Sequence, residues 1–173
     1  MQLETRYTAS KEKTMKGDIT MTADIGAVKL PPPRHIGVVV KDIEKTVEYY
    51  SSMWGLGPWM KFERVVTKEQ MLAEGLYNTS YTLKIAAAQW GPVTLELLQP
   101  VEGKSVWADF LETSGEGLHH LCYDVPNWEE VVGQLKKQGA KMLVGARTEA
   151  VTWCYFETSP GGLIIEIKQG GAF

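Results

Sequence analysis

An internal repeat constrains the fold of this chain more than any other sequence feature. The segments that begin at His35 and at His120 both continue as a run of strand-forming residues, then an Asp or Asn, and then a Glu within a helical pattern. The ends of the two halves also correspond, because Glu96 and Glu166 each lie in an apolar strand-like run that ends in Gln. A frame that opens with His and closes with Glu in both halves suggests a metal site shared by two modules.

Each half is predicted to follow the order β-α-β-β-β. Runs of β-branched residues indicate the strands, and apolar residues at helical spacing after an N-cap residue indicate the helices. The first half is predicted as strand Arg34–Val40, helix Asp42–Trp54, and strands Trp59–Val66, Thr79–Ala88 and Val93–Leu98. The second half is predicted as strand Leu118–Val125, helix Asn127–Gln138, and strands Lys141–Ala146, Val151–Glu157 and Leu163–Lys168. The longer spacing from His to Glu in the first half predicts an inserted loop at Thr67–Asn78 beside the site.

The alternation of side chains along a strand predicts which residues share a face. The apolar neighbours of Glu96 and Glu166 need a helix to cover them, so both carboxylates point to the other side of the sheet. If helices cover one side only, the opposite side carries these carboxylates together with the imidazoles of His35 and His120. Imidazole and carboxylate together suit a divalent ion such as zinc, nickel, cobalt, manganese or iron.

His119 is the rival of its neighbour His120 for the role of ligand. Its counterpart in the first half is Arg34, and alternation places His119 on the helix-facing side of the strand. The ligand role is therefore assigned to His120. His119 is expected either to be structural or to support the ligand by contacting it from behind. A single His on a strand is more often an ordinary hydrogen-bonded residue, but recurrence at equivalent points of both halves favours a ligand.

Composition excludes several classes of function. The chain has 173 residues, 44% hydrophobic and 23% charged, which is close to the average for soluble globular domains. A net charge of −3 gives no electrostatic case for nucleic acid, and no stretch is long enough to span a membrane. Cys122 and Cys154 lie in predicted strands without a Cys-x-x-Cys pattern, so we expect reduced thiols in a cytoplasmic protein.

The predicted domain organisation is one domain preceded by a loose extension. Residues 1–33 are polar and weakly patterned and end in three prolines. The domain covers residues 34–173, with module one at 34–100, a linker at 101–116 and module two at 117–169. The linker is expected to contain a helix at Ser105–Glu112. Among the tryptophans, Trp54, Trp59, Trp90 and Trp153 suggest an aromatic pocket, although ordinary core packing is favoured for Trp54.

The repeated residues resemble the vicinal oxygen chelate superfamily, which includes glyoxalase I, extradiol dioxygenases and bleomycin-resistance-type proteins. The resemblance is strongest to methylmalonyl-CoA epimerase-like proteins, through the segments His35–Lys45, Leu95–Pro100, Gly115–Leu121 and Gly161–Glu166. It implies an α+β fold in which two βαβββ modules form a cupped mixed sheet around one divalent metal ion, with helices on the outer face. By motif position it implies that His35, Glu96, His120 and Glu166 hold the metal.

The function implied by the resemblance is a metal-dependent isomerase or lyase of the glyoxalase or epimerase type. Such an enzyme stabilises an enediolate or enolate on a divalent ion, and Glu166 or Glu96 would serve as the catalytic base. One alternative is an Fe(II) extradiol-type dioxygenase that uses His35, His120 and Glu166. Another is a non-catalytic protein that binds an aromatic ligand. The expected partners are a small-molecule substrate, either 2-oxo, thioester or aromatic, and a second copy of the chain in a homodimer.

Overall fold

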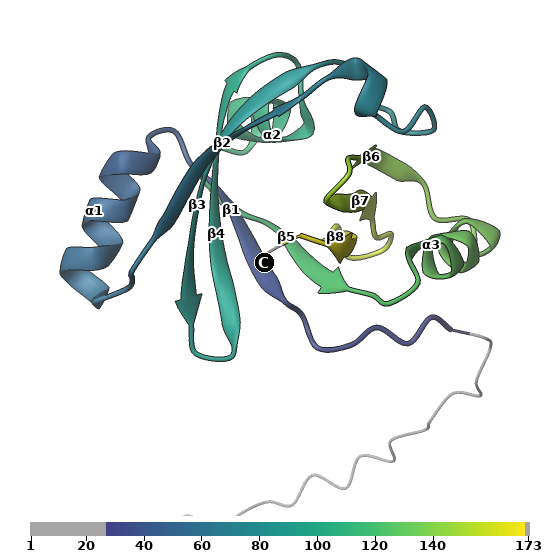
Figure 1. Ribbon diagram of the computed structural model, residues 1–173, viewed down its shortest axis with the longest axis horizontal. Coiled ribbons are helices and arrows are strands. Elements are labelled where there is room, and N and C mark those ends of the chain that lie inside the picture. The colour runs from purple at the N-terminus through teal and green to yellow at the C-terminus, as the bar shows by residue number, and fades with distance from the viewer. Residues whose placement is uncertain (1–26, 172–173) are drawn as a thin grey trace, which may run out of the picture.

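Both halves of the chain form the predicted β-α-β-β-β module, as the computed structural model in Figure 1 shows for residues 27–171. Module one comprises β1 (His35–Val39), α1 (Ile43–Trp54), β2 (Met60–Val66), β3 (Tyr81–Trp90) and β4 (Val93–Glu102). Module two comprises β5 (Gly117–Asp124), α3 (Trp128–Lys137), β6 (Met142–Arg147), β7 (Val151–Glu157) and β8 (Ile164–Gly170). The linker contains α2 (Val106–Thr113), and residues 1–26 of the predicted extension lie outside the described residues.

The two modules join edge to edge into one curved sheet of eight strands. The strand order is β2-β3-β4-β1-β5-β8-β7-β6, so the opening strands β1 and β5 meet at the centre as an antiparallel pair. Each opening strand also pairs in parallel with the closing strand of its own module, β1 with β4 and β5 with β8. The four strands that carry the repeated His and Glu are therefore the four central strands of the sheet.

The helices cover different faces of this sheet. At one end α1 packs over the outer-face residues Ala86, Leu95 and Leu97, and at the other end α3 packs over Cys154, Phe156 and Ile167 (Figure 1). The linker helix α2 instead contributes Trp107 to the cluster that fills the concave face. Among the described residues, no helix is long and apolar enough to cross a membrane.

The repeat extends to the hydrogen bonds that begin the two module helices. Asp42 caps α1 and Asn127 caps α3, each accepting from a backbone N–H three residues on, at 3.1 and 3.3 Å. A glutamine at the end of each module then accepts from the first helical N–H, Gln99 at 2.9 Å and Gln169 at 3.0 Å. Because these bonds satisfy amides that a helix leaves unpaired, they fix each helix to the closing strand of its module.

The inserted loop of module one crosses to module two. The backbone N–H of Leu72 donates to the carbonyl of Gly145 on β6 at 2.8 Å, and that of Tyr77 donates to another β6 carbonyl at 3.0 Å. Gly145 has to be glycine here, because an added Cβ would lie 2.9 Å from both the backbone oxygen of Trp153 and the Cβ of Cys154 on β7. The Tyr77 hydroxyl donates to Asp109 of α2 at 2.7 Å. The loop therefore connects both modules and the linker helix.

Candidate metal centre

The strand register brings the four predicted residues together in two adjacent rows across the sheet. In one row Glu96 on β4, Gly37 on β1 and His120 on β5 lie side by side. In the other row His35 on β1, Cys122 on β5 and Glu166 on β8 lie side by side. Each row thus holds one imidazole and one carboxylate separated by a small residue, so the long side chains meet above Gly37 and Cys122.

The four side chains converge on a single point. The Nε2 atoms of His35 and His120 are 3.2 Å apart, and the Oε2 atom of Glu166 lies 3.0 and 3.2 Å from them. The Oε2 atom of Glu96 lies 3.4 Å from the His35 Nε2 and 3.7 Å from the His120 Nε2. All four residues are buried, with exposed fractions of 4% or less.

This donor set fits a divalent metal ion. Bonds of about 2.0–2.2 Å from a metal to nitrogen and oxygen place neighbouring ligand atoms about 3.0–3.5 Å apart. The separations at the site fall in or close to this range. Two carboxylates buried side by side are unfavourable without a cation between them, and imidazole with carboxylate is a common donor set for zinc and its neighbours.

The electrostatics of the site agree with this fit. Burial raises the pKa of Glu166, but hydrogen bonds from His120 and His35 outweigh it and hold that pKa well below the usual value. Burial lowers the pKa of His35, but the nearby charges of Glu96 and Glu166 outweigh it and raise that pKa. The carboxylates therefore attract positive charge to this point, which a divalent cation would supply.

Gly37 provides the space that the His120 ring occupies. A Cβ atom at Gly37 would lie 1.9 Å from Cε1 and 2.3 Å from Nδ1 of that ring. Because real contacts between such atoms are never that short, any other residue at this position would move His120. Gly37 was not among the predicted site residues. Its position two residues after His35, on the same face of the strand, is the sequence signal for it.

The predicted face of His119 is wrong because β5 contains a bulge. The register with β1 shifts so that Gly37 lies opposite His120 while Val38 lies opposite Leu118, leaving His119 between them. The extra residue turns both histidines to the concave side, where the His119 ring packs against Phe110 of α2 with ring centroids 5.0 Å apart. Alternation along a regular strand cannot reveal such a shift.

His119 lies directly behind His120. Their Nδ1 atoms are 3.0 Å apart, and burial, together with His120, lowers the pKa of His119 to about 3. His119 is therefore neutral, and its Nδ1 can accept a hydrogen bond from the Nδ1–H of His120. This arrangement leaves the His120 Nε2 lone pair directed at the site, which is the tautomer that a metal ligand requires.

The concave face above the site is closed by aromatic side chains. The Tyr155 hydroxyl on β7 lies 3.3 Å from the His120 Nε2, and the Tyr155 ring packs against Trp107 and Trp153 with centroids 5.4 Å apart in both pairs. Neither Tyr155 nor Trp107 was among the residues predicted near the site. Their positions depend on how α2 packs on the concave face and how β7 curves with the sheet, and the repeat does not predict either feature.

The other tryptophans lie away from this face. Trp54, for which core packing was favoured, is 71% exposed, and Trp90 is 57% exposed at the β3–β4 turn. Both line a groove on the outer face between α1 and the sheet, together with Leu95. Of the four tryptophans named from the sequence, only Trp153 packs into the concave face beside the four converging residues.

Three further polar groups lie near the site. The Cys122 thiol is within 4.8 Å of His35 and Glu166, and both cysteines are free, as predicted. Burial and the charge of Glu166 raise the pKa of Cys122, so it remains a neutral thiol. Lys168 is buried, and its Nζ atom lies 3.3 Å from Asp124.

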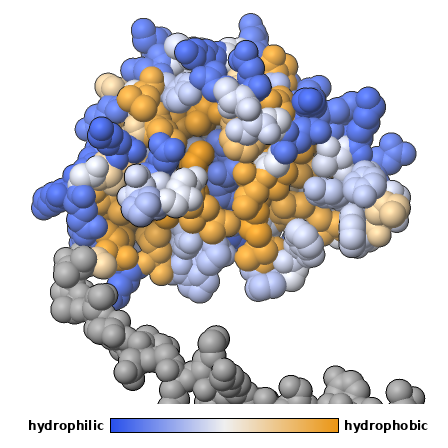
Figure 2. Space-filling view, turned by 180° about the vertical axis from the view of Figure 1, so that it is seen from behind, coloured by the Kyte–Doolittle hydropathy of each residue, from blue (hydrophilic) through white to orange (hydrophobic). Residues whose placement is uncertain are grey.

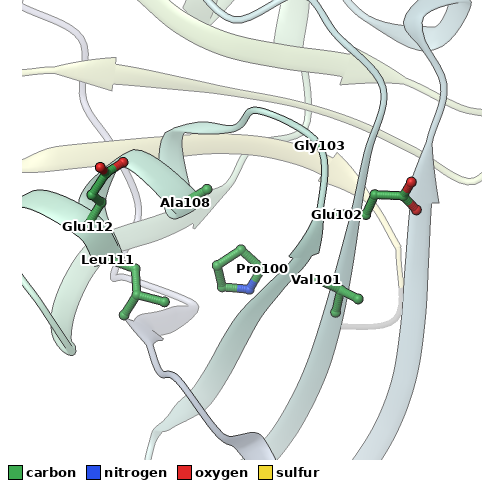
Figure 3. A pocket seen from close by; sticks show the side chains of 7 residues that line it. All are labelled: Pro100, Val101, Glu102, Gly103, Ala108, Leu111 and Glu112. Atoms are coloured by element: carbon green, nitrogen blue, oxygen red, sulfur yellow. The ribbon is translucent and has the colours of Figure 1, made fainter.

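A separate pocket lies where the end of β4 meets α2 (Figure 3). Its lining includes Pro100, Leu111 and the acidic residues Glu102 and Glu112, which lie on opposite sides of it. It contains none of the four converging residues and no basic side chain. The concave site is therefore the better candidate for chemistry.

The fold and this site define a member of a known family. Residues 34–156 match the Glyoxalase/Bleomycin resistance protein/Dioxygenase superfamily, and the chain belongs to it. Similar proteins include the mitochondrial methylmalonyl-CoA epimerase of Homo sapiens, which is 25% identical over 141 residues, covering 78% of this chain and 72% of that protein. An uncharacterised Bacillus subtilis protein, YqjC, is 32% identical over 89 residues, which are 51% of this chain and 54% of that protein.

Solved structures show the same fold. A variant of the Streptomyces coelicolor methylmalonyl-CoA epimerase, in complex with 2-nitronate-propionyl-CoA, matches with a TM-score of 0.64 at 21% identity, over 83% of this chain and 100% of that chain. A variant of 4-hydroxymandelate synthase from the same organism matches with a TM-score of 0.56 at 17% identity, over 83% of this chain and 50% of that chain. The epimerase relative identified by sequence supports an enzyme of epimerase or isomerase type.

Proposed function

We propose that the protein is a metal-dependent isomerase of the epimerase or glyoxalase type, acting on a small 2-oxo or thioester substrate. The observation that carries this proposal is the convergence of four buried side chains, His35, Glu96, His120 and Glu166, at separations that suit one divalent ion. A divalent ion held there would act as a Lewis acid on two neighbouring oxygens of the substrate. It would thereby favour loss of a proton from the adjacent carbon atom.

The two carboxylates are the bases of the proposed reaction. Glu96 and Glu166 reach the centre from β4 and β8, on opposite sides of the central pair of strands. One can therefore remove a proton from carbon and the other return it from the opposite side, as epimerisation requires. Glu96 lies farther from both imidazoles than Glu166, so we assign proton removal first to Glu96.

Tyr155 is the hydrogen-bond donor of the proposed reaction. Burial and the charge of Glu166 raise its pKa, so the phenol keeps its proton. Its hydroxyl, 3.3 Å from the His120 Nε2, is close enough to donate to a substrate oxygen that develops negative charge at the site.

Metal content and proton exchange test the proposal together. The protein is purified without chelator, reconstituted with cobalt, nickel, zinc or manganese, and assayed by elemental analysis. Exchange of the 2-proton of methylmalonyl-CoA is then followed in deuterium oxide. We expect about one ion per chain, weaker binding in Glu96→Ala, and exchange that needs the metal. Glu44→Ala, which changes an exposed glutamate on α1, is the control and is expected to behave as wild type.

Two results would replace this proposal with another function. Bound ferrous iron that is indifferent to Glu96→Ala would favour a dioxygenase that uses the remaining two imidazoles and one carboxylate. Absence of metal under every condition would favour a binding protein for an aromatic ligand. Stoichiometric metal without exchange on methylmalonyl-CoA would keep the isomerase class and direct the search to other thioesters and 2-oxo compounds.

We also propose that the chain forms a homodimer in a reducing compartment such as the cytoplasm. Two free, buried cysteines are compatible with that compartment. Apolar surface forms a broad band on the face turned away from the viewer in Figure 1, as Figure 2 shows. The outer-face groove lined by Tyr49, Trp54 and Trp90 exposes more than half of each of these side chains. Sedimentation equilibrium would measure the oligomeric state, and a monomer at micromolar concentration would contradict the dimer.

A further inference from the structure

The small residue at the centre of each row of the candidate metal centre differs between the two modules. In one row Gly37 separates Glu96 from His120. In the other row Cys122 separates the second imidazole from Glu166. Both positions come two residues after the repeated His, so they are equivalent in the repeat. Only the row of Glu166 therefore carries a polar side chain between its imidazole and its carboxylate.

The Cys122 thiol lies beside the Glu166 carboxylate. Its sulfur is within 4.8 Å of a carboxylate oxygen of Glu166 and of a ring nitrogen of His35, and the side chain has no exposed surface. Burial and the charge of Glu166, together with a hydrogen bond between the two groups, raise the pKa of Cys122, so the sulfur keeps its proton. An ionised carboxylate can only accept, so the S–H group is the donor of this bond.

Glu96 has no comparable donor beside it. In the part of the chain that the structure describes, its polar contacts are with the imidazoles of His35 and His120, at 3.4 and 3.7 Å. Its neighbours in the row across the strands are Gly37 on β1 and Ala87 on β3, and neither has a polar side chain. The two glutamates thus differ in one hydrogen bond, although the repeat makes their strands equivalent.

We propose that Cys122 is a positioning residue that fixes the Glu166 carboxylate through its S–H group and leaves Glu96 as the more mobile base. This inference rests on the proposed function and gives its two glutamates unequal parts. A carboxylate that keeps one oxygen hydrogen-bonded loses rotational freedom and presents its other oxygen in a fixed direction. Cys122 acts only through Glu166, so its loss should affect the proton transfers of that glutamate and not those of Glu96.

Infrared spectroscopy tests the thiol bond directly, with or without metal. The S–H stretch is separate from other protein bands, and donation to a carboxylate lowers its frequency. We expect a low-frequency band that Cys122→Ala removes and Cys154→Ala retains. Cys154 is the matched control, because it is equally buried but packs in the apolar cluster on the outer face. Glu166→Gln should raise the frequency of the Cys122 band, since a neutral amide is a weaker acceptor. A Cys122 band at the frequency of an unbonded thiol, or one unmoved by Glu166→Gln, overturns the proposal.

Deuterium exchange from each epimer of methylmalonyl-CoA tests the consequence for the two bases. Inversion uses both glutamates, so Cys122→Ala should slow it from either epimer by about 10- to 100-fold. Exchange with retention of configuration uses one glutamate only, so it should slow for one epimer and stay near the wild-type rate for the other. Equal slowing of retention exchange for both epimers is the result of general damage to the site and would overturn the proposal.

Two further variants separate the hydrogen bond from packing. Cys122→Ser keeps a donor at the same position, so it should recover most of the rate lost in Cys122→Ala. Cys154→Ala removes a buried thiol of the same size and should exchange as wild type does. Rates in Cys122→Ser as low as those in Cys122→Ala would count against the hydrogen bond.

Failure of the proposed function would be visible separately. A wild-type protein that binds no metal or exchanges no proton would remove the proposed reaction, while the infrared band still decides whether Cys122 holds Glu166. A low-frequency band in such a protein would support the positioning of Glu166, and its absence would overturn it.

Discussion

Replacing Gly37 by alanine is expected to disable the proposed metal centre without changing any of its four proposed ligands. The new Cβ would lie 1.9 Å from Cε1 of His120, whereas carbon atoms in contact are about 3.5–4.0 Å apart. The ring would therefore have to withdraw by about 1.5–2 Å. Metal–ligand distances tolerate changes of only about 0.2 Å, so His120 could not remain a ligand. We expect the affinity for cobalt to fall by more than about 100-fold, the upper end of the loss caused by groups that only support a ligand.

The affinity is measured by competition with a chelator, using the visible spectrum of bound cobalt. Gly133→Ala is the control, because Gly133 lies within α3 with nothing near the position of its Cβ, and alanine there should stabilise the protein by about 0.5–1 kcal/mol. Overpacking at Gly37→Ala should cost about 1–3 kcal/mol, and the double variant with His120→Ala should recover most of it. Wild-type affinity in Gly37→Ala would refute this reasoning.

Four further outcomes follow from the structure. Replacing His119 by Phe removes the acceptor behind His120, so affinity for cobalt in the same competition assay should fall about 10–100-fold. Tyr155→Phe should retain the metal and slow deuterium exchange on methylmalonyl-CoA by about 100-fold, and an unchanged rate would exclude the phenol as a donor. Asp42→Ala removes the cap of α1 and should lower the free energy of unfolding in urea by about 1 kcal/mol. Tyr77→Phe breaks the bond from the inserted loop to α2, and should lower that free energy by about 0.5–1.5 kcal/mol without altering the cobalt affinity.

The sequence predicts most of the fold because the repeat allows each helix and strand to be predicted twice, once in each half of the chain. A strand or helix in one half is checked by its counterpart in the other, and Asp42 with Asn127 or Gln99 with Gln169 even make the same bonds. Alternation within the closing strands then places both glutamates on one face. These are local rules, and they hold where the strands are regular.

The features that the sequence could not predict depend on contacts between distant segments. The bulge that turns His119 inward exists only in the register of β5 against β1. The position of Trp107 depends on how the linker helix packs over the concave face of the sheet, and the spacing of apolar residues within that helix does not predict this packing. Trp54 lies on the apolar stripe of α1 but is the last residue of that helix and is 71% exposed, so helical spacing overestimated its burial.

The bulge also makes the two imidazoles unequal. His120 has a neighbour that can accept its Nδ1–H, whereas the Nδ1 atom of His35 is buried without a partner among the described residues. A ligand whose far nitrogen donates a hydrogen bond is more basic and better fixed, so an ion should be held more firmly by His120. We therefore expect metal exchange to begin with the release of His35, and the lifetime of the bound ion to depend on the module that lacks the bulge.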